Sequence, residues 1–130
     1  MSLSPLFREA ELIHAYSRAQ AMADGVLVDV SVMAQEAGFK VPVALTAAVW
    51  ADCVAWPKED GLQDEAGRLW DVLTMARFEA RRHVNVQVLP FRVLRVPRGG
   101  VKPALTQLTL HIGPGDQAEP VITILQPGED

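Results

Sequence analysis

The sequence predicts an α+β fold in one domain, residues 1–130, in which N-terminal helices pack on a C-terminal three-stranded antiparallel meander. Apolar residues recur at helical spacing over about 11–83 and alternate with polar residues over about 84–126. Short turn sequences join the alternating segments, which favours antiparallel neighbours with the helices on their apolar face. A chain of 130 residues has the length of one domain and can bury a core without disulfides or metal.

The first helical segments are bounded by glycines. Residues 12–24 place apolar side chains at helical spacing, and Gly25 follows as a C-terminal stop. Ser31 can cap a second, short helix that closes at Gly38. Between these helices, residues 26–30 are apolar and β-branched, which predicts a strand or an extended connector.

Two longer helices are predicted next. Pro42 suits the first turn of a helix over about 43–54. After a Pro- and Gly-containing loop, the longest helix begins at Asp60 or Asp64 and runs to about His83. The helical part of the chain therefore ends where the alternating pattern begins.

Three strands are predicted in the remaining sequence. The first covers about 84–96, the second 107–112 and the third 121–125, with a turn at 98–100. Pro90 lies inside the first strand and should either cause a bulge or mark a sheet edge, because proline cannot donate to a ladder.

Charge is distributed unevenly along the chain. The net charge is −4 and the pI about 5.3, yet residues 77–102 contain seven Lys/Arg and one acid. Residues 1–76 have a net charge of −6 and residues 103–130 a net charge of −4. The candidate anion-binding residues of the basic stretch are Arg77, Arg81, Arg82, Arg92, Arg95, Arg98 and Lys102.

Two interpretations of this basic stretch stay open. The arginines could form one face that binds a nucleic-acid backbone, with a gain from counterion release. Alternatively, they could stabilise a helix C-terminus, protect an edge strand or pair with acids of residues 1–76. The structural interpretation is favoured, because nucleic-acid-binding domains usually carry a basic overall balance.

No catalytic or metal-binding motif is found. No histidine lies at a spacing from Cys53 that would indicate a catalytic dyad, so Cys53 is expected to be a small core residue. The three histidines are scattered, and zinc sites normally show paired ligands at short spacing. We therefore predict no catalytic residue, no metal and no cofactor. Trp50 and Trp70 are expected to be buried, and Trp56 partly exposed.

The single cysteine and the hydropathy suggest a location. One cysteine excludes an intrachain disulfide and fits the reducing cytoplasm. No apolar run approaches the length that spans a bilayer, so no membrane partner is predicted.

Three segments carry a resemblance to known proteins. They are Ile13–Ser31 (IHAYSRAQAMADGVLVDVS), Val43–Trp50 (VALTAAVW) and Asp64–Leu73 (DEAGRLWDVL). With these segments the chain resembles a family of small uncharacterised bacterial proteins that are often encoded on plasmids, phages and other mobile elements. The resemblance covers about residues 11–82 and implies a bacterial cytosolic setting and an accessory role in mobile-element biology. The family has no assigned activity, so no catalytic role is implied.

These segments are rich in polar side chains that could form a corner or a pocket. The candidates are Tyr16, Arg18, Gln20, Asp24, Asp29 and Asp71. Arg18 could form a bidentate ion pair with Asp29 or Asp71 that locks the corner. Alternatively, Tyr16, Arg18 and Asp71 could line a small pocket. The locking role is favoured.

Taken together, the sequence predicts a non-enzymatic domain that binds a protein partner or itself as a homo-oligomer. The absent catalytic signature, the expected strand edge near Pro90 and the segregated charge lead to this prediction. One alternative is a nucleic-acid-associated accessory protein of a mobile element that uses residues 77–102. A second is a small hydrolase or transferase, which would need Arg18 and the acids of the polar corner to converge in one pocket.

Overall fold

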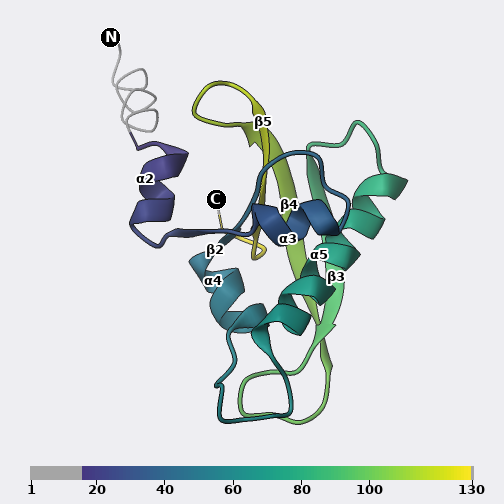
Figure 1. Cartoon of the computed structure of the whole chain (residues 1–130). Coiled ribbons are helices and arrows are strands. Elements are labelled where there is room, and N and C mark those ends of the chain that lie inside the picture. Colours follow the sequence, from purple (N-terminus) through teal and green to yellow (C-terminus); the bar gives the residue numbers. More distant parts are fainter. Residues whose placement is uncertain (1–15, 130) are drawn as a thin grey trace.

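The computed structural model describes residues 16–129 and shows a five-stranded mixed sheet with helices packed on it (Figure 1). The strand order is β1-β2-β5-β4-β3, and all neighbouring pairs are antiparallel except β2 and β5, which are parallel. In chain order the elements are α2 (Arg18–Ala23), β1 (Leu27–Asp29), α3 (Ser31–Glu36), β2 (Val43–Thr46), α4 (Ala47–Val49), the π-helix η1 (Trp50–Val54), α5 (Glu65–Arg82), β3 (Val88–Arg95), β4 (Ala104–Pro114) and β5 (Pro120–Leu125).

The prediction of a three-stranded antiparallel meander was wrong. Strands β3, β4 and β5 do form a meander, but β5 also pairs with β2, and β2 pairs with β1. The error lies at Val43–Thr46, which was predicted as helix and forms β2, an interior strand between β1 and β5. A short apolar run fits a buried strand as well as a buried helix, and its parallel partner β5 lies far along the chain.

The longest helix is confirmed, whereas the first strand of the meander starts later than predicted. Asp64 is the N-cap of α5, and its side chain accepts a hydrogen bond from the Gly67 N–H at 2.7 Å. Strand β3 begins at Val88 and not at Val84, because Asn85 has a φ of 69°, which extended backbone does not allow.

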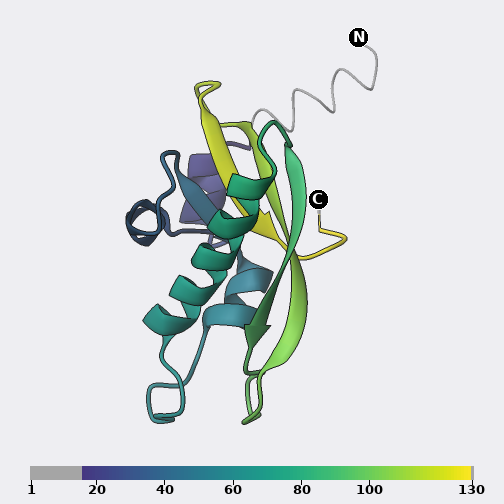
Figure 2. The ribbon, with the colours of Figure 1, turned by 90° about the vertical axis from the view of Figure 1, so that its right-hand side faces the viewer.

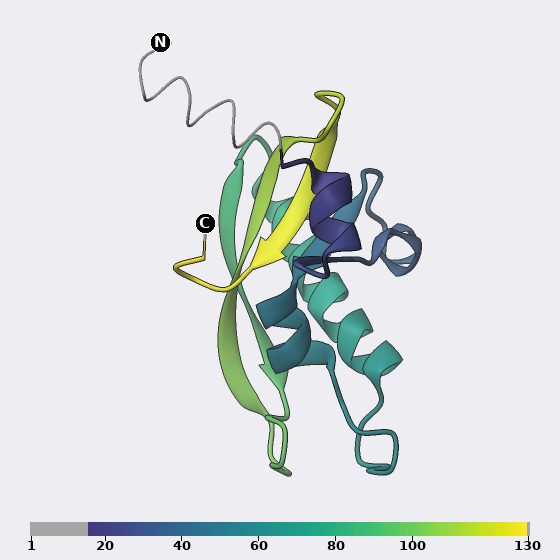
Figure 3. The same ribbon diagram turned by 90° about the vertical axis from the view of Figure 1, so that its left-hand side faces the viewer.

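Helices α3 and α5 lie on the same side of the sheet (Figures 2 and 3). Along β3 the burial alternates strictly, so that Leu89, Phe91 and Val93 face the helices while their neighbours face outward. Buried residues of β2, β4 and β5 continue this inner face, which α5 covers with Leu69, Val72, Leu73 and Ala76. Among the described residues, no helix has the length and apolarity that crossing a membrane requires.

Arg68 of α5 is the one charged side chain among residues 16–129 that is almost completely buried, at 3% exposure. Its guanidinium donates to the carbonyl oxygens of Val54 at 3.0 Å, Val96 at 2.8 Å and Asp52 at 3.3 Å. It also stacks on the Trp56 ring, 4.7 Å from the centroid. Arg68 thereby fastens α5 to the C-terminal end of η1 and to the chain that follows β3.

Two of the three tryptophan predictions were wrong. Trp56 is 5% exposed, because its ring packs under Arg68 and its Nε1 donates to the Asp60 carbonyl oxygen at 2.9 Å. Trp70 is 41% exposed, since it lies on the outer side of α5. Trp50 is partly buried against the core.

Candidate functional site

Strand β3 lies at one edge of the sheet, so one of its sides has no neighbouring strand among the described residues. The Ile112 N–H donates to the Gln87 carbonyl oxygen at 2.8 Å, which fixes the ladder pattern between β3 and β4. Hydrogen-bonded pairs alternate in an antiparallel ladder. Leu89, Phe91 and Val93 therefore bond to β4, and the alternate residues direct their backbone polar groups to the open edge. These edge positions are Val88, Pro90, Arg92 and Leu94.

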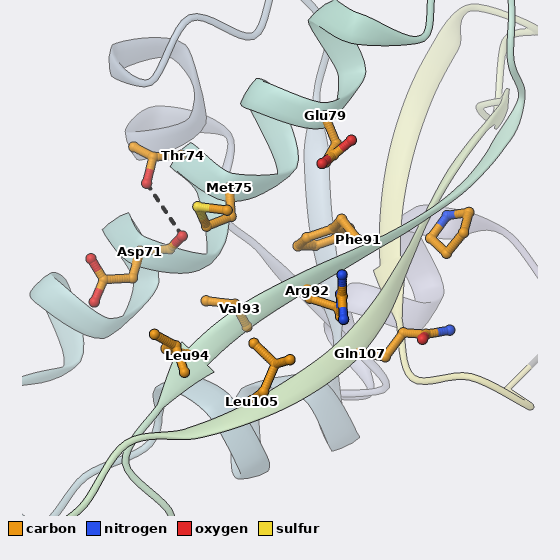
Figure 4. A pocket seen from close by; sticks show the side chains of 11 residues that line it. Asp71, Thr74, Met75, Glu79, Phe91, Arg92, Val93, Leu94, Leu105 and Gln107 are labelled. Atoms are coloured by element: carbon orange, nitrogen blue, oxygen red, sulfur yellow. Dashed lines mark hydrogen bonds between the residues drawn. The ribbon is translucent and has the colours of Figure 1, made fainter.

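A groove of about 740 Å³ runs between this edge and α5 (Figure 4). It is lined by Asp71, Thr74, Met75, Glu79, Pro90, Phe91, Arg92, Val93, Leu94, Leu105 and Gln107. The buried rings and methyl groups of Phe91 and Val93 form its floor, and Met75 extends over it from α5. We call this cavity the α5–β3 groove. It combines an unpaired strand edge with an apolar floor.

Charged side chains lie at both sides of the α5–β3 groove. Asp71 and Glu79 come from α5, and Arg92 comes from β3. Glu79 pairs with Arg82 at 3.4 Å and with His83 at 3.5 Å, both one helical turn away and largely exposed. Asp71 is exposed, and its carboxylate makes no ion pair with any side chain in residues 16–129. The helical wall of the groove is therefore acidic.

Large apolar side chains are exposed next to the groove, on the outer face of the sheet. Val88, Leu94 and Leu105 are each more than half exposed, and Leu94 lies directly opposite Leu105 in the ladder. Leu94 and Leu105 therefore form a small exposed apolar pair, whereas Val88 lies farther along the same face, beyond Pro90 and Arg92. The pair continues the α5–β3 groove around the strand edge.

The residues of the predicted polar corner do not all lie together, because Asp71 lies apart from the others. Tyr16 donates to Asp24 at 3.1 Å, and partial desolvation together with the neighbouring Asp24 carboxylate raises the pKa of the tyrosine. Asp29 accepts from the backbone and side chain of Ser31 at 3.0 and 2.6 Å. Asp71 belongs to the α5–β3 groove. The convergent arrangement that the hydrolase alternative requires is therefore not present.

Arg18 does lock its corner, but through different partners from those predicted. Its guanidinium donates to the Thr123 hydroxyl and to the Ile122 carbonyl oxygen of β5, both at 2.7 Å. The N–H groups of Arg18 and Ala19 donate to the Asp116 carboxylate at 2.7 and 3.0 Å, which lowers the pKa of Asp116. Burial lowers the pKa of Arg18, and nearby carboxylates oppose this shift.

Gln20 contributes nothing to this lock through its side chain. Its backbone N–H donates to the Ser17 hydroxyl at 2.9 Å, and the residue is exposed. Ser17 thus acts as the N-cap of α2.

The basic stretch is divided over several places. Arg77 donates to the Gly38 carbonyl oxygen at 2.9 Å, and Arg95 pairs with Asp52 at 3.0 Å. Arg98 donates to the Ala51 carbonyl oxygen at 3.3 Å. Arg92 lies at the α5–β3 groove, and Lys102 is exposed in the turn between β3 and β4. These residues do not form one continuous cationic face.

Part of the stretch does form a small basic patch around Phe78. Phe78 is 54% exposed, and the Arg82 guanidinium lies over its ring at 5.6 Å. A cavity of about 550 Å³ beside it is lined by Ala37, Thr74, Arg77, Phe78, Arg81 and Arg82. The charge pattern of the sequence predicts the arginines, whereas Phe78 carries no signal that would distinguish it from a core residue of the helix.

Cys53 is a core residue, as predicted, with no exposed surface. Burial raises the pKa of its thiol to about 12, and the nearby Asp52 carboxylate, 3.6 Å from Sγ, acts in the same direction. A thiol with such a pKa stays protonated and unreactive at neutral pH. Within residues 16–129, no three His, Cys, Asp or Glu side chains are grouped in a way that could hold a metal ion.

Comparisons with known proteins add one finding. A search of curated proteins and a search of solved structures each found no match. A family model described as a family of unknown function, DUF6573, matches residues 3–130. The chain therefore belongs to the DUF6573 family.

Proposed function

We propose that this domain binds an extended segment of a partner protein, which adds as a sixth strand along the open edge of β3. The observation that supports this function is the combination of four edge positions on β3 with the α5–β3 groove beside them. Strand addition takes affinity from main-chain hydrogen bonds and specificity from pockets that accept alternate side chains. The groove is such a pocket, and the exposed pair of Leu94 and Leu105 offers contacts on the other face.

The edge itself favours a foreign segment over a second copy of the chain. Val88, Arg92 and Leu94 offer both an N–H and a carbonyl, whereas Pro90 offers a carbonyl alone. If two β3 strands paired symmetrically about Arg92, the two guanidiniums would lie opposite each other, which is unfavourable. Proline and charge on an edge strand are the usual protection against self-pairing. Sedimentation of the free chain tests the alternative, self-association into a homo-oligomer, which would appear as a mass above that of one chain.

A selection from random linear peptides tests this function. Peptides selected on the wild-type chain should bind the Arg92→Pro variant at least 10-fold more weakly, because it loses an edge N–H without losing a ladder bond. Arg92→Ala is the matched control, since it removes the charge but keeps the N–H, and it should retain binding within a few-fold.

Leu94→Pro repeats the experiment at a second edge position in case Arg92→Pro does not fold, with circular dichroism and melting as checks on each variant. Selected peptides that bind both proline variants as well as the wild type would refute strand addition at β3.

The proposal includes the biological setting. We place this binding in the bacterial cytoplasm, as an accessory step in the biology of a mobile element. Support comes from the resemblance of residues 11–82 and from the single, buried thiol of Cys53, which suits a reducing compartment.

A second candidate function, binding of single-stranded nucleic acid, is favoured by the basic patch around Phe78. A half-exposed aromatic ring can stack on a base, and the guanidiniums of Arg81 and Arg82 can reach the adjacent phosphates. The net charge of −4 and the use of Arg77 in the bond to Gly38 oppose it. It therefore ranks below strand addition.

Titration with a labelled oligo(dT) at low and physiological salt tests this second function. If the patch binds nucleic acid, Phe78→Ala should weaken binding about 5- to 150-fold, in line with about 1–3 kcal/mol per stacked base. Phe78→Trp should restore binding, and Lys102→Ala, a charge change elsewhere, should have little effect. Absence of binding at low salt, or binding indifferent to Phe78, would remove this candidate.

A further inference from the structure

The α5–β3 groove indicates what kind of segment it accepts, and this inference rests on the strand-addition function proposed above. Asp71, Met75 and Glu79 follow one another at four-residue intervals along α5, and all three line the groove. With a rise of about 1.5 Å per residue, their Cα atoms lie about 6 Å and 12 Å apart along the helix axis. The wall therefore presents acid, thioether and acid at regular spacing.

An added strand has nearly the same spacing on one of its faces. Alternate residues of a strand point to the same side, about 6.6 Å apart, so that positions i, i+2 and i+4 span about 13 Å. In Figure 4, the axes of α5 and β3 lie alongside each other across the groove, with opposite chain directions. A strand laid beside β3 can therefore place three consecutive inward side chains opposite Asp71, Met75 and Glu79.

The chemistry of the three positions follows from their surroundings. The middle side chain meets Met75 and the apolar floor of Phe91, so it should be apolar, and the pliable thioether of Met75 can adapt to its shape. The outer two meet the carboxylates of Asp71 and Glu79. Asp71 has no competing ion pair within the described residues. Glu79 is paired with the half-exposed Arg82 at 3.4 Å, and with His83 only when that imidazole is protonated, and pairs with such exposed partners are weak.

The opposite face of the added strand meets a different environment. Its outward side chains would lie beside Arg92 and Leu94 on the outer face of the sheet. A basic residue there would be repelled by Arg92. The position of the basic residues therefore matters as well as their number.

We propose that the α5–β3 groove selects an extended segment in which basic, apolar and basic residues occupy positions i, i+2 and i+4, with uncharged residues between them. Charge complementarity with Asp71 and Glu79 at matched spacing carries this inference. A second copy of the chain is a poorer occupant, because its own α5 would bring the same two acids to the interface.

Four synthetic peptides with identical flanks test the proposal by fluorescence anisotropy at low salt. Their cores are Lys-Thr-Val-Thr-Lys, Thr-Thr-Val-Thr-Thr, Glu-Thr-Val-Thr-Glu and the isomer Thr-Lys-Val-Lys-Thr. The first should bind about 3- to 10-fold more tightly than the neutral peptide, as expected of two partly exposed ion pairs. The acidic peptide should bind more weakly than the neutral one, and the isomer should lose the advantage of the first.

Variants connect the preference to the two acids. Asp71→Asn and Glu79→Gln should each reduce the advantage of the Lys-Thr-Val-Thr-Lys peptide over the neutral one, and Asp71→Lys should shift the preference toward the acidic peptide. Glu36→Gln, the same charge change on α3 and outside the groove, should leave the ranking unchanged.

The possible results separate this inference from the function on which it rests. If all four peptides bind alike and all lose binding in Arg92→Pro, strand addition stands and the basic preference is wrong. Equal binding of the isomer and the Lys-Thr-Val-Thr-Lys peptide would also overturn the preference, because it would show that charge alone decides. If the Lys-Thr-Val-Thr-Lys peptide does not bind at all, the basic preference is also wrong. Strand addition at β3 is then tested separately by the peptides selected on the wild-type chain.

Discussion

Arg68→Ala is expected to lower the free energy of unfolding by about 3–5 kcal/mol, because two buried carbonyl groups and one partly buried carbonyl group lose their donor. An unsatisfied buried acceptor costs about 1–3 kcal/mol, and water that enters the space left by the side chain offsets part of the sum. The carbonyl oxygens of Val54 and Asp52 belong to the C-terminal end of η1, where the helix dipole also favours a cation.

Chemical denaturation followed by circular dichroism measures this effect, with two comparisons. Arg68→Lys should recover little of the loss, since an ammonium group cannot donate in the planar fork that reaches three separate carbonyls. Arg98→Ala removes an exposed arginine with one 3.3 Å bond and should cost under about 1 kcal/mol. A loss of under 1 kcal/mol in Arg68→Ala would show that Arg68 does not fasten α5 to η1.

Above pH 9 the chain is expected to lose stability through Cys53. The folded-state pKa of this thiol is about 12, against 9.0 for a thiol that is exposed to water. The unfolded chain therefore releases its thiol proton first as the pH rises, and unfolding becomes easier. Below the pKa of the unfolded thiol, Cys53 costs the folded state nothing in this way. Between the unfolded and the folded pKa the free energy of unfolding falls by about 1.4 kcal/mol per pH unit, or about 4 kcal/mol in total.

Comparison with Cys53→Ala isolates this contribution. The variant should be less stable than the wild type at pH 7, because it leaves a small cavity, and the difference should shrink steadily above pH 9. Other groups that titrate in this range are common to both proteins and cancel. A difference that stays constant to pH 11, or a native thiol that reacts rapidly with a disulfide reagent at pH 8, would contradict the raised pKa of Cys53.

Local signals were sufficient for most elements. The N-cap Asp64 and the apolar stripe of Leu69, Val72 and Leu73 specify α5, and period-two alternation specifies β4 and the burial pattern of β3. Pro90 pointed to a sheet edge, and β3 is an edge strand. These features depend on residues that are close in sequence.

What could not be predicted depends on contacts between distant residues. Val43–Thr46 becomes a strand because β5 pairs with it, and nothing near Val43 indicates this partner. Likewise, the Arg18 guanidinium donates to Thr123 and the Arg18 N–H to Asp116, both about a hundred residues along the chain. Arg18 forms no ion pair with the acids in its own segment among the described residues. Met75 lines the groove because α5 packs beside β3, and the helical pattern alone does not distinguish it from the other apolar residues of α5.

Hydrogen exchange along β3, followed residue by residue with NMR, tests the central claim most directly. In the free chain the N–H groups of Leu89, Phe91 and Val93 should exchange slowly, and those of Arg92 and Leu94 rapidly, because the former bond to β4 and the latter face the open edge. Addition of a peptide selected on the wild-type chain should slow exchange at Arg92 and Leu94 and leave the other three unchanged. Rapid exchange that persists at Arg92 and Leu94 in the saturated complex would show that the peptide does not add to β3.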